Sequence, residues 1–181
     1  MATLITHPIP ALVLNQFTKD IPSKRSLLNY SILMTLLPDA DVIGFGFGIE
    51  YGDMLGHRGF THSIVFAILI SIIISKFLLN YTGKNLRVGF IILFLSTMSH
   101  GLLDAFTNGG LGVGFFIPFD GSRYFFQYTP VEVSPIGIRN FISMRGLEVI
   151  WSEAKLIWIP SLIIFLTSWA FKKIQQKKNS L

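Results

Sequence analysis

The sequence predicts an all-α protein that crosses a membrane several times. Its 181 residues are 51% hydrophobic and only 14% charged, with a mean hydropathy of +0.57. Soluble domains carry about 25% charged residues, so this chain has too little polar surface to cover a water-soluble globule. Three of its apolar runs approach or reach the length that a bilayer-spanning helix needs. These observations predict one membrane-embedded domain over residues 1–181.

The three longer apolar runs predict spanning helices over residues 62–80, 86–106 and 156–171. The first is interrupted only by Lys76 near its end, where a long side chain can reach the headgroups. The third is the shortest, and the lysines that follow it would lie at headgroup level. In the first run, Thr61 is the expected N-cap, which places His62 in the first helical turn.

Two shorter apolar stretches, residues 8–17 and 26–37, precede these runs, and each is too short for a full crossing. They are joined by KDIPSKR, so residues 8–37 are expected to form a short helical hairpin packed against the spanning helices. Residues 107–155 are mixed in character and rich in glycine and proline, which predicts an ordered extramembrane segment. GFGFG at residues 44–48 lacks the spacing of a dinucleotide-binding loop and is predicted to be a flexible loop.

The basic residues predict the orientation of the chain. If the hairpin turn, the 80–87 loop and the C-terminal tail share one side, that side holds ten of the 15 basic residues and, in Asp20, one of the ten acids. The excess of lysine and arginine marks this side as cytoplasmic. The same residues form no stripe interleaved with exposed aromatic side chains, so nucleic-acid binding is not predicted.

Imidazole and carboxylate groups gather on the opposite side. His100 and Asp104 are four residues apart, so on a helix they share one face and can bind one cation together, or else form a buried polar pair between helices. The chain has no cysteine, so any metal would be held by histidine and aspartate, a mixture that suits zinc first, and also manganese or iron. The candidates on this side are His7, Asp39, Asp41, His57, His62, His100 and Asp104.

Three further residues are candidates for catalytic roles. Arg58 and Arg123 are possible clamps for a substrate phosphate. The alternative is that they are ordinary surface arginines, which usually have no binding role. Glu153, at the start of the last span, is a candidate ligand or base. It is equally well explained as a first-turn acid favoured by the helix dipole.

The sequence resembles the YdjM family of membrane-bound, predicted metal-dependent hydrolases, and most closely its YbcI-like branch. The resemblance rests on ITH at residues 5–7, LLPDAD at 36–41, GHRGFTHS at 56–63 and SHGLLDAFTNGG at 99–110. It implies a helical protein of the bacterial inner membrane with a divalent-metal site and a hydrolase activity. The distribution of basic residues predicts that this site faces the periplasm and that the C-terminus is cytoplasmic. The family's motif residues correspond here to His7, Asp39, His57, His62, His100 and Asp104.

Two functions remain open from the sequence. The favoured one is a metal-dependent hydrolase, in which the metal lowers the pKa of a water molecule and polarises the ester. A phospholipid or another phosphoester is the expected substrate, because the site would lie at headgroup depth in the bilayer. The alternative is a non-enzymatic membrane protein, either a metal transporter or a structural subunit. Transport would need ligands near the middle of the membrane.

Overall fold

Helices form nearly all the regular structure of the computed structural model, which describes residues 1–18, 21–135 and 138–179. No strand occurs in these ranges, and only two isolated bridges join loop residues. The helices, including short 3-10 (η1, η2) and π (η3, η4) segments, are α1 Pro8–Asn15, α2 Lys24–Leu36, η1 Leu37–Phe47, η2 Phe60–His62, α3 Ile64–Ile73, η3 Ile74–Leu78, α4 Gly83–Ala105, α5 Ile138–Phe141, α6 Met144–Glu153, η4 Ala154–Trp158 and α7 Ile159–Asn179. The predicted all-α class is confirmed.

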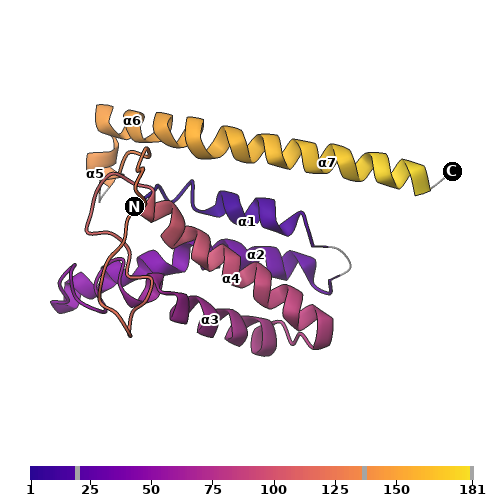
Figure 1. Ribbon diagram of the computed structural model, residues 1–181, viewed down its shortest axis with the longest axis horizontal. Helices are drawn as coiled ribbons and strands as arrows, with labels where there is room; N and C mark the ends of the chain where they lie inside the picture. The colour runs from indigo at the N-terminus through magenta and orange to yellow at the C-terminus, as the bar shows by residue number, and fades with distance from the viewer. Residues whose placement is uncertain (19–20, 136–137, 180–181) are drawn as a thin grey trace.

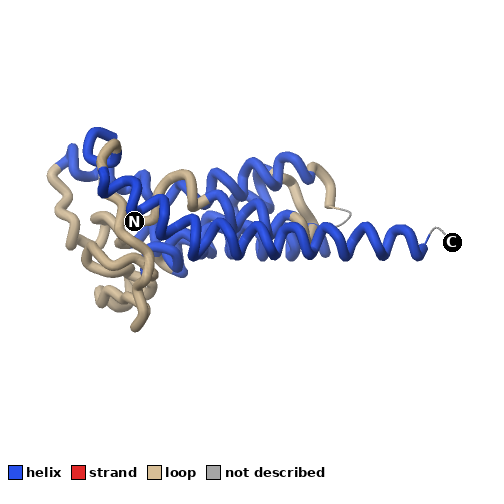
Figure 2. The backbone as a smooth tube through the Cα atoms, turned by 90° about the horizontal axis from the view of Figure 1, so that it is seen from above, coloured by secondary structure: helices blue, strands red, loops and turns tan. Residues whose placement is uncertain are grey.

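Helices α1 to α4 lie side by side, and α6 continues into α7 as one long helix beside α1 (Figure 1). The buried core of the bundle includes Leu27 and Met34 of α2, Leu93 of α4 and Ile74 of η3. The irregular segments gather at one end of the bundle (Figure 2). Apolar side chains therefore pack the helices together along their length, and the polar candidate residues lie at the end that holds the irregular segments.

Three helical runs are long and apolar enough to cross a membrane, judged by length and composition: Lys24–Phe47, Gly83–Ala105 and Met144–Gln175. The second matches the predicted span over 86–106. The predicted span over 62–80 is shorter in the structure, because its helix runs only from Ile64 to Leu78. At about 1.5 Å per residue it covers roughly 22 Å, less than the roughly 30 Å of a bilayer core.

The expected short hairpin also differs, because its second arm does not end at residue 37. After α2 the chain continues through η1 to Phe47. Pro38 lies near the start of η1, where its missing N–H removes no necessary hydrogen bond. The prediction of a flexible loop at 44–48 is therefore wrong. Helical structure ends only at Gly48, whose φ of 80° lies in the left-handed region that glycine adopts most easily.

The last helix begins earlier than predicted. Residues 144–155 were expected in the extramembrane segment, but they belong to α6 and η4, which join the predicted 156–171 span to form Met144–Gln175. Two π-helical segments occur: η3 forms the end of the helix that starts with α3, and η4 joins α6 to α7. The pattern of apolar residues in the sequence does not predict either π-helical segment.

The two ends of the bundle differ in chemistry. The end of α1, the start of α2, the α3–α4 turn and the end of α7 lie at one end (Figure 1). The loops that carry the histidines lie at the other. Asp20, the acid assigned to the basic end, lies outside the described residues. The arrangement brings the predicted basic segments to one end, while the side of the membrane that this end faces remains a prediction.

We expect the basic end to face the cytoplasm, since lysine and arginine accumulate on that side. A single cysteine at Lys178 should then resist a membrane-impermeant maleimide in intact cells, whereas one at Ser122 should react. The native chain contains no cysteine that would add background. Permeabilised cells, in which both positions should react, provide the control. Labelling at residue 178 but not at residue 122 in intact cells would show that the orientation in the membrane is the opposite of the predicted one.

Candidate metal centre

The HRGFTHS turn is shaped by its glycine and by its serine. A Cβ on Gly59 would lie 2.4 Å from the carbonyl oxygen of Met54, so only glycine fits. The turn ends in η2, and α3 begins after Ser63, whose side chain accepts a hydrogen bond from the backbone N–H of Phe66. The predicted cap, Thr61, is therefore wrong. His62 is the last residue of η2, so it lies before α3 and not in the first turn of that helix.

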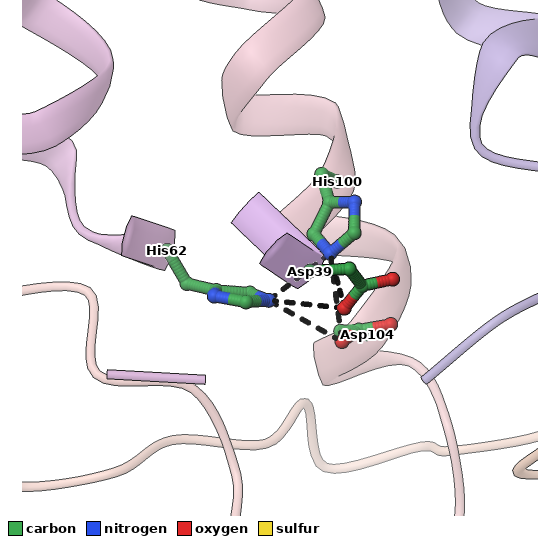
Figure 3. Close-up of side chains that lie close together, drawn as sticks. All are labelled: Asp39, His62, His100 and Asp104. Atoms are coloured by element: carbon green, nitrogen blue, oxygen red, sulfur yellow. Dashed lines mark hydrogen bonds and ion pairs between the residues drawn. The ribbon is translucent and has the colours of Figure 1, made fainter. Parts of the chain in front are cut away.

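Four side chains from three segments converge on one point (Figure 3). Asp39 comes from η1, His62 from η2, and His100 and Asp104 from one face of α4. The Nε2 atoms of His62 and His100 are 3.0 Å apart. Asp39 Oδ1 lies 3.3 Å from His100 Nε2 and 3.8 Å from His62 Nε2. Asp104 Oδ2 lies 3.7 Å from His62 Nε2 and 3.9 Å from His100 Nε2.

These separations fit the ligand shell of a small divalent ion. Ligands at about 2.0–2.1 Å in tetrahedral geometry around zinc are about 3.3 Å apart. All four side chains are buried. Neither oxygen of Asp39 accepts a hydrogen bond from any described residue, which is costly for a buried carboxylate unless a cation is nearby. The donor set and its orphaned oxygens both fit a metal.

Hydrogen bonds behind the cluster orient the two imidazoles toward its centre. His100 Nδ1 lies 2.7 Å from the carbonyl oxygen of Thr35, which can only accept, so Nδ1 carries the proton. His62 Nδ1 lies 3.3 Å from Asp41 Oδ2 and 3.1 Å from Thr61 Oγ1. In the neutral rings this leaves the Nε2 lone pairs facing each other and the carboxylates. Metal-binding histidines are typically held in this way.

Asp41 is the centre of a hydrogen-bond network. Its Oδ1 lies 2.7 Å from His57 Nδ1, and its Oδ2 accepts from the backbone N–H of Arg58 and the hydroxyl of Thr61. Asp39, Asp41 and His57 also lie close enough to form a second three-residue group. Because the oxygens of Asp41 already have protein donors, we interpret Asp41 and His57 as supports for His62. The sequence placed His57 among the ligands and gave Asp41 no separate role.

His7 lies beside the four-residue group without being part of it. Its ring stacks on His100 with centroids 3.8 Å apart, and its Nε2 is 3.6 Å from Asp104 Oδ1. Neither of its nitrogens has a hydrogen-bond partner among the described residues. Burial lowers the pKa of His7 to about 3 and also lowers the pKa of His62. Both rings are therefore neutral at pH 7 and able to bind a cation.

Arg58 is buried against the cluster. Its Nε is 3.0 Å from Asp104 Oδ2, and its other nitrogens donate to Thr107 Oγ1 and the carbonyl oxygen of Gly109. Its φ of 62° is unusual for a residue with a side chain. The guanidinium thus contacts protein groups on every branch. The phosphate-clamp role predicted for it would require these contacts to open.

Carboxylates outnumber guanidinium groups in the cluster. Asp39, Asp41 and Asp104 are buried there, and Arg58 is the guanidinium beside them. Such an excess of carboxylates is unfavourable in a buried environment unless a protonated imidazole or a metal ion adds positive charge. A divalent ion would supply that charge.

The other two predicted catalytic residues lie outside the four-residue group. Arg123 donates to the backbone carbonyl oxygens of His57, Tyr51 and Asp53, and so ties the 51–57 loop to the 123 segment. Glu153 accepts hydrogen bonds from the backbone N–H and hydroxyl of Thr3 and from the hydroxyl of Thr6. In this arrangement Glu153 holds the segment that precedes His7. The sequence offered no signal for the roles of Thr3 and Thr6.

The fold and this cluster define a helical membrane protein with a buried cluster of histidine and aspartate side chains. The YdjM inner membrane protein family matches residues 1–178, and the chain belongs to this family. It is 36% identical to the inner membrane protein YbcI of Escherichia coli (strain K12) over 171 residues, which cover 93% of this chain and 98% of that protein. The predicted resemblance is therefore confirmed, and the protein is one of the bacterial inner membrane. No solved structure matches the chain significantly.

Proposed function

We propose that the protein is a membrane-embedded, metal-dependent hydrolase whose substrate is a phosphoester lipid. The observation that supports this most is the convergence of Asp39, His62, His100 and Asp104 around one buried point. A divalent ion held there would supply the Lewis acidity that phosphoester hydrolysis needs.

The chain's own residues have distinct tasks in this proposal. Thr35 and Asp41 hold the two imidazoles in the tautomer that leaves Nε2 free to bind. Arg58 offsets part of the negative charge and fixes Asp104. The apolar helices around the cluster exclude bulk water, which strengthens electrostatic interactions inside it. In hydrolysis, water adds to phosphorus, the P–O bond to the alcohol breaks, and the departing alcohol gains a proton.

One observation favours a second candidate, a structural metal site. Catalytic zinc sites usually have three protein ligands and an open position, whereas structural sites have four and are closed. Here four candidate ligands are present and all are buried. In this alternative the ion would join η1, η2 and α4 without any chemistry.

We expect protein purified in detergent without chelator to contain about one divalent ion per chain, zinc being the first candidate. Elemental analysis measures the content. Hydrolysis is measured as release of phosphate or headgroup from vesicles of phosphatidic acid or phosphatidylglycerol. Chelation should stop turnover, and added zinc or manganese should restore it.

The outcomes separate the two candidates. Chelator-sensitive turnover supports the hydrolase. Bound metal with no turnover on either lipid, together with a lower melting temperature after chelation, favours the structural site. Folded protein that contains no metal contradicts both.

A further inference from the structure

A groove runs beside α7, and none of the four candidate metal ligands lines it. It lies between α1, the start of α2 and the η4–α7 helix, and its volume is about 990 Å³. Its walls are almost entirely apolar and include Leu12, Val13, Leu28, Leu162 and Phe165. Binding sites for small amphipathic molecules have volumes of roughly 300–1,000 Å³. The groove is thus large enough for a lipid chain.

One end of the groove is basic. Lys24 and Arg25 line it there, at the start of α2. Lys24 Nζ donates one hydrogen bond to the carbonyl oxygen of Thr18, which leaves two of its three donors. Arg25 is exposed and forms no ion pair with any described residue, Asp20 being outside the described ranges. Lys172 of α7 donates to the backbone oxygen of Gln16, another lining residue.

The start of α2 adds a third feature. The side chain of Ser23, the N-cap residue, makes no capping hydrogen bond, and none from the other described residues is seen there. Unsatisfied N–H groups and the helix dipole therefore favour an anion at the same place as the two cations. Basic pockets between membrane helices on the cytoplasmic side bind acidic lipid headgroups.

We propose that this groove binds an anionic phospholipid, with its headgroup at Lys24 and Arg25 and an acyl chain along α1. The apolar wall and the basic end together match one amphipathic molecule. A second copy of this chain fits less well, because two copies with the same membrane orientation would bring their basic ends together. The proposal does not depend on metal binding or hydrolysis, because the lining residues include none of the four candidate ligands.

The test uses the full-length protein, delipidated in detergent and titrated with phosphatidylglycerol or phosphatidylcholine of identical chains. Native mass spectrometry counts the bound lipids. Wild type should retain phosphatidylglycerol about tenfold or more better than phosphatidylcholine, because each basic residue contributes roughly fivefold. The double variant Lys24→Ser/Arg25→Ser should lose this preference. Its matched control is Lys84→Ser/Arg87→Ser, which removes the same charge from the start of α4, outside the groove.

A second pair of variants tests the apolar wall. Leu12 and Leu69 are both about half exposed, but only Leu12 lines the groove. Leu12→Trp should fill the groove and weaken binding of both lipids, whereas Leu69→Trp should not. Equal retention of the two lipids by wild type would overturn the proposal. So would an equal loss in both charge variants, or a wild-type dimer that Leu12→Trp dissociates without changing lipid binding.

Discussion

Replacing His100 with alanine is expected to remove the bound metal and to abolish hydrolysis. Its Nε2 lies within 4 Å of three other candidate ligand atoms. Loss of a residue that only orients a ligand costs roughly 10- to 100-fold in metal affinity, so loss of a ligand should cost more. Asp104→Ala should act in the same way, because the two side chains share one face of α4. Isothermal titration with zinc measures the first effect, and lipid hydrolysis measures the second.

Two other variants make this test specific. Ser99→Ala changes the neighbouring residue, whose hydroxyl bonds only to its own helix, and should leave the zinc affinity unchanged. His57→Ala should have an intermediate effect, since His57 contacts the cluster through Asp41. If His100→Ala and Ser99→Ala bind zinc equally well, the four-residue site is wrong. If zinc binding falls but turnover does not, the site is not catalytic.

Replacing Arg58 with methionine is expected to cause the largest loss of stability. The change leaves Asp104 buried without its guanidinium and raises the uncompensated charge of the cluster. Removing one partner of a buried ion pair typically costs about 3–5 kcal/mol. In a chain of this size that corresponds to a fall in melting temperature of about 10 °C. Thermal unfolding in detergent, followed by circular dichroism, measures the difference.

Arg145→Met is the matched control for Arg58→Met. Arg145 forms ion pairs with Glu132 and Glu148, but its side chain is 43% exposed. Exposed pairs contribute about 0–1 kcal/mol, because water and salt screen them. We expect a shift of only a few degrees. Equal shifts in the two variants would mean that the charge of Arg58 is not required by a buried anionic cluster.

The sequence was sufficient to predict the convergence of the polar residues. Apolar runs placed His62 and His100 near the same end of different helices, and the spacing of His100 and Asp104 placed both on one face. It was less informative about helix length. Residues 38–47 contain a proline and two glycines, which favour a loop, yet η1 continues to Phe47. Residues 144–153 are mixed in polarity, so the start of the last helix was missed as well.

The roles of the supporting residues could not be predicted, because they arise from contacts between distant parts of the chain. Glu153 appeared as a candidate base at a helix start, but in the fold Thr3 and Thr6 donate hydrogen bonds to its carboxylate. Arg123 appeared as a phosphate clamp, but four backbone carbonyl groups accept its hydrogen bonds. No local pattern encodes such contacts. The sequence identified the residues that form the cluster better than it identified the residues that hold them.

The attachment of the N-terminal segment has a consequence for the order of assembly. The backbone N–H of Ala2 donates to Asp104, His7 stacks on His100, and Glu153 holds Thr3. During synthesis the ribosome completes residues 39–104 well before residue 153. At about 5–20 residues per second the interval between residues 104 and 153 is roughly 2–10 seconds. All four candidate ligands are therefore synthesised before the anchor of the segment that covers them, so an ion would not need the finished protein to open in order to reach them.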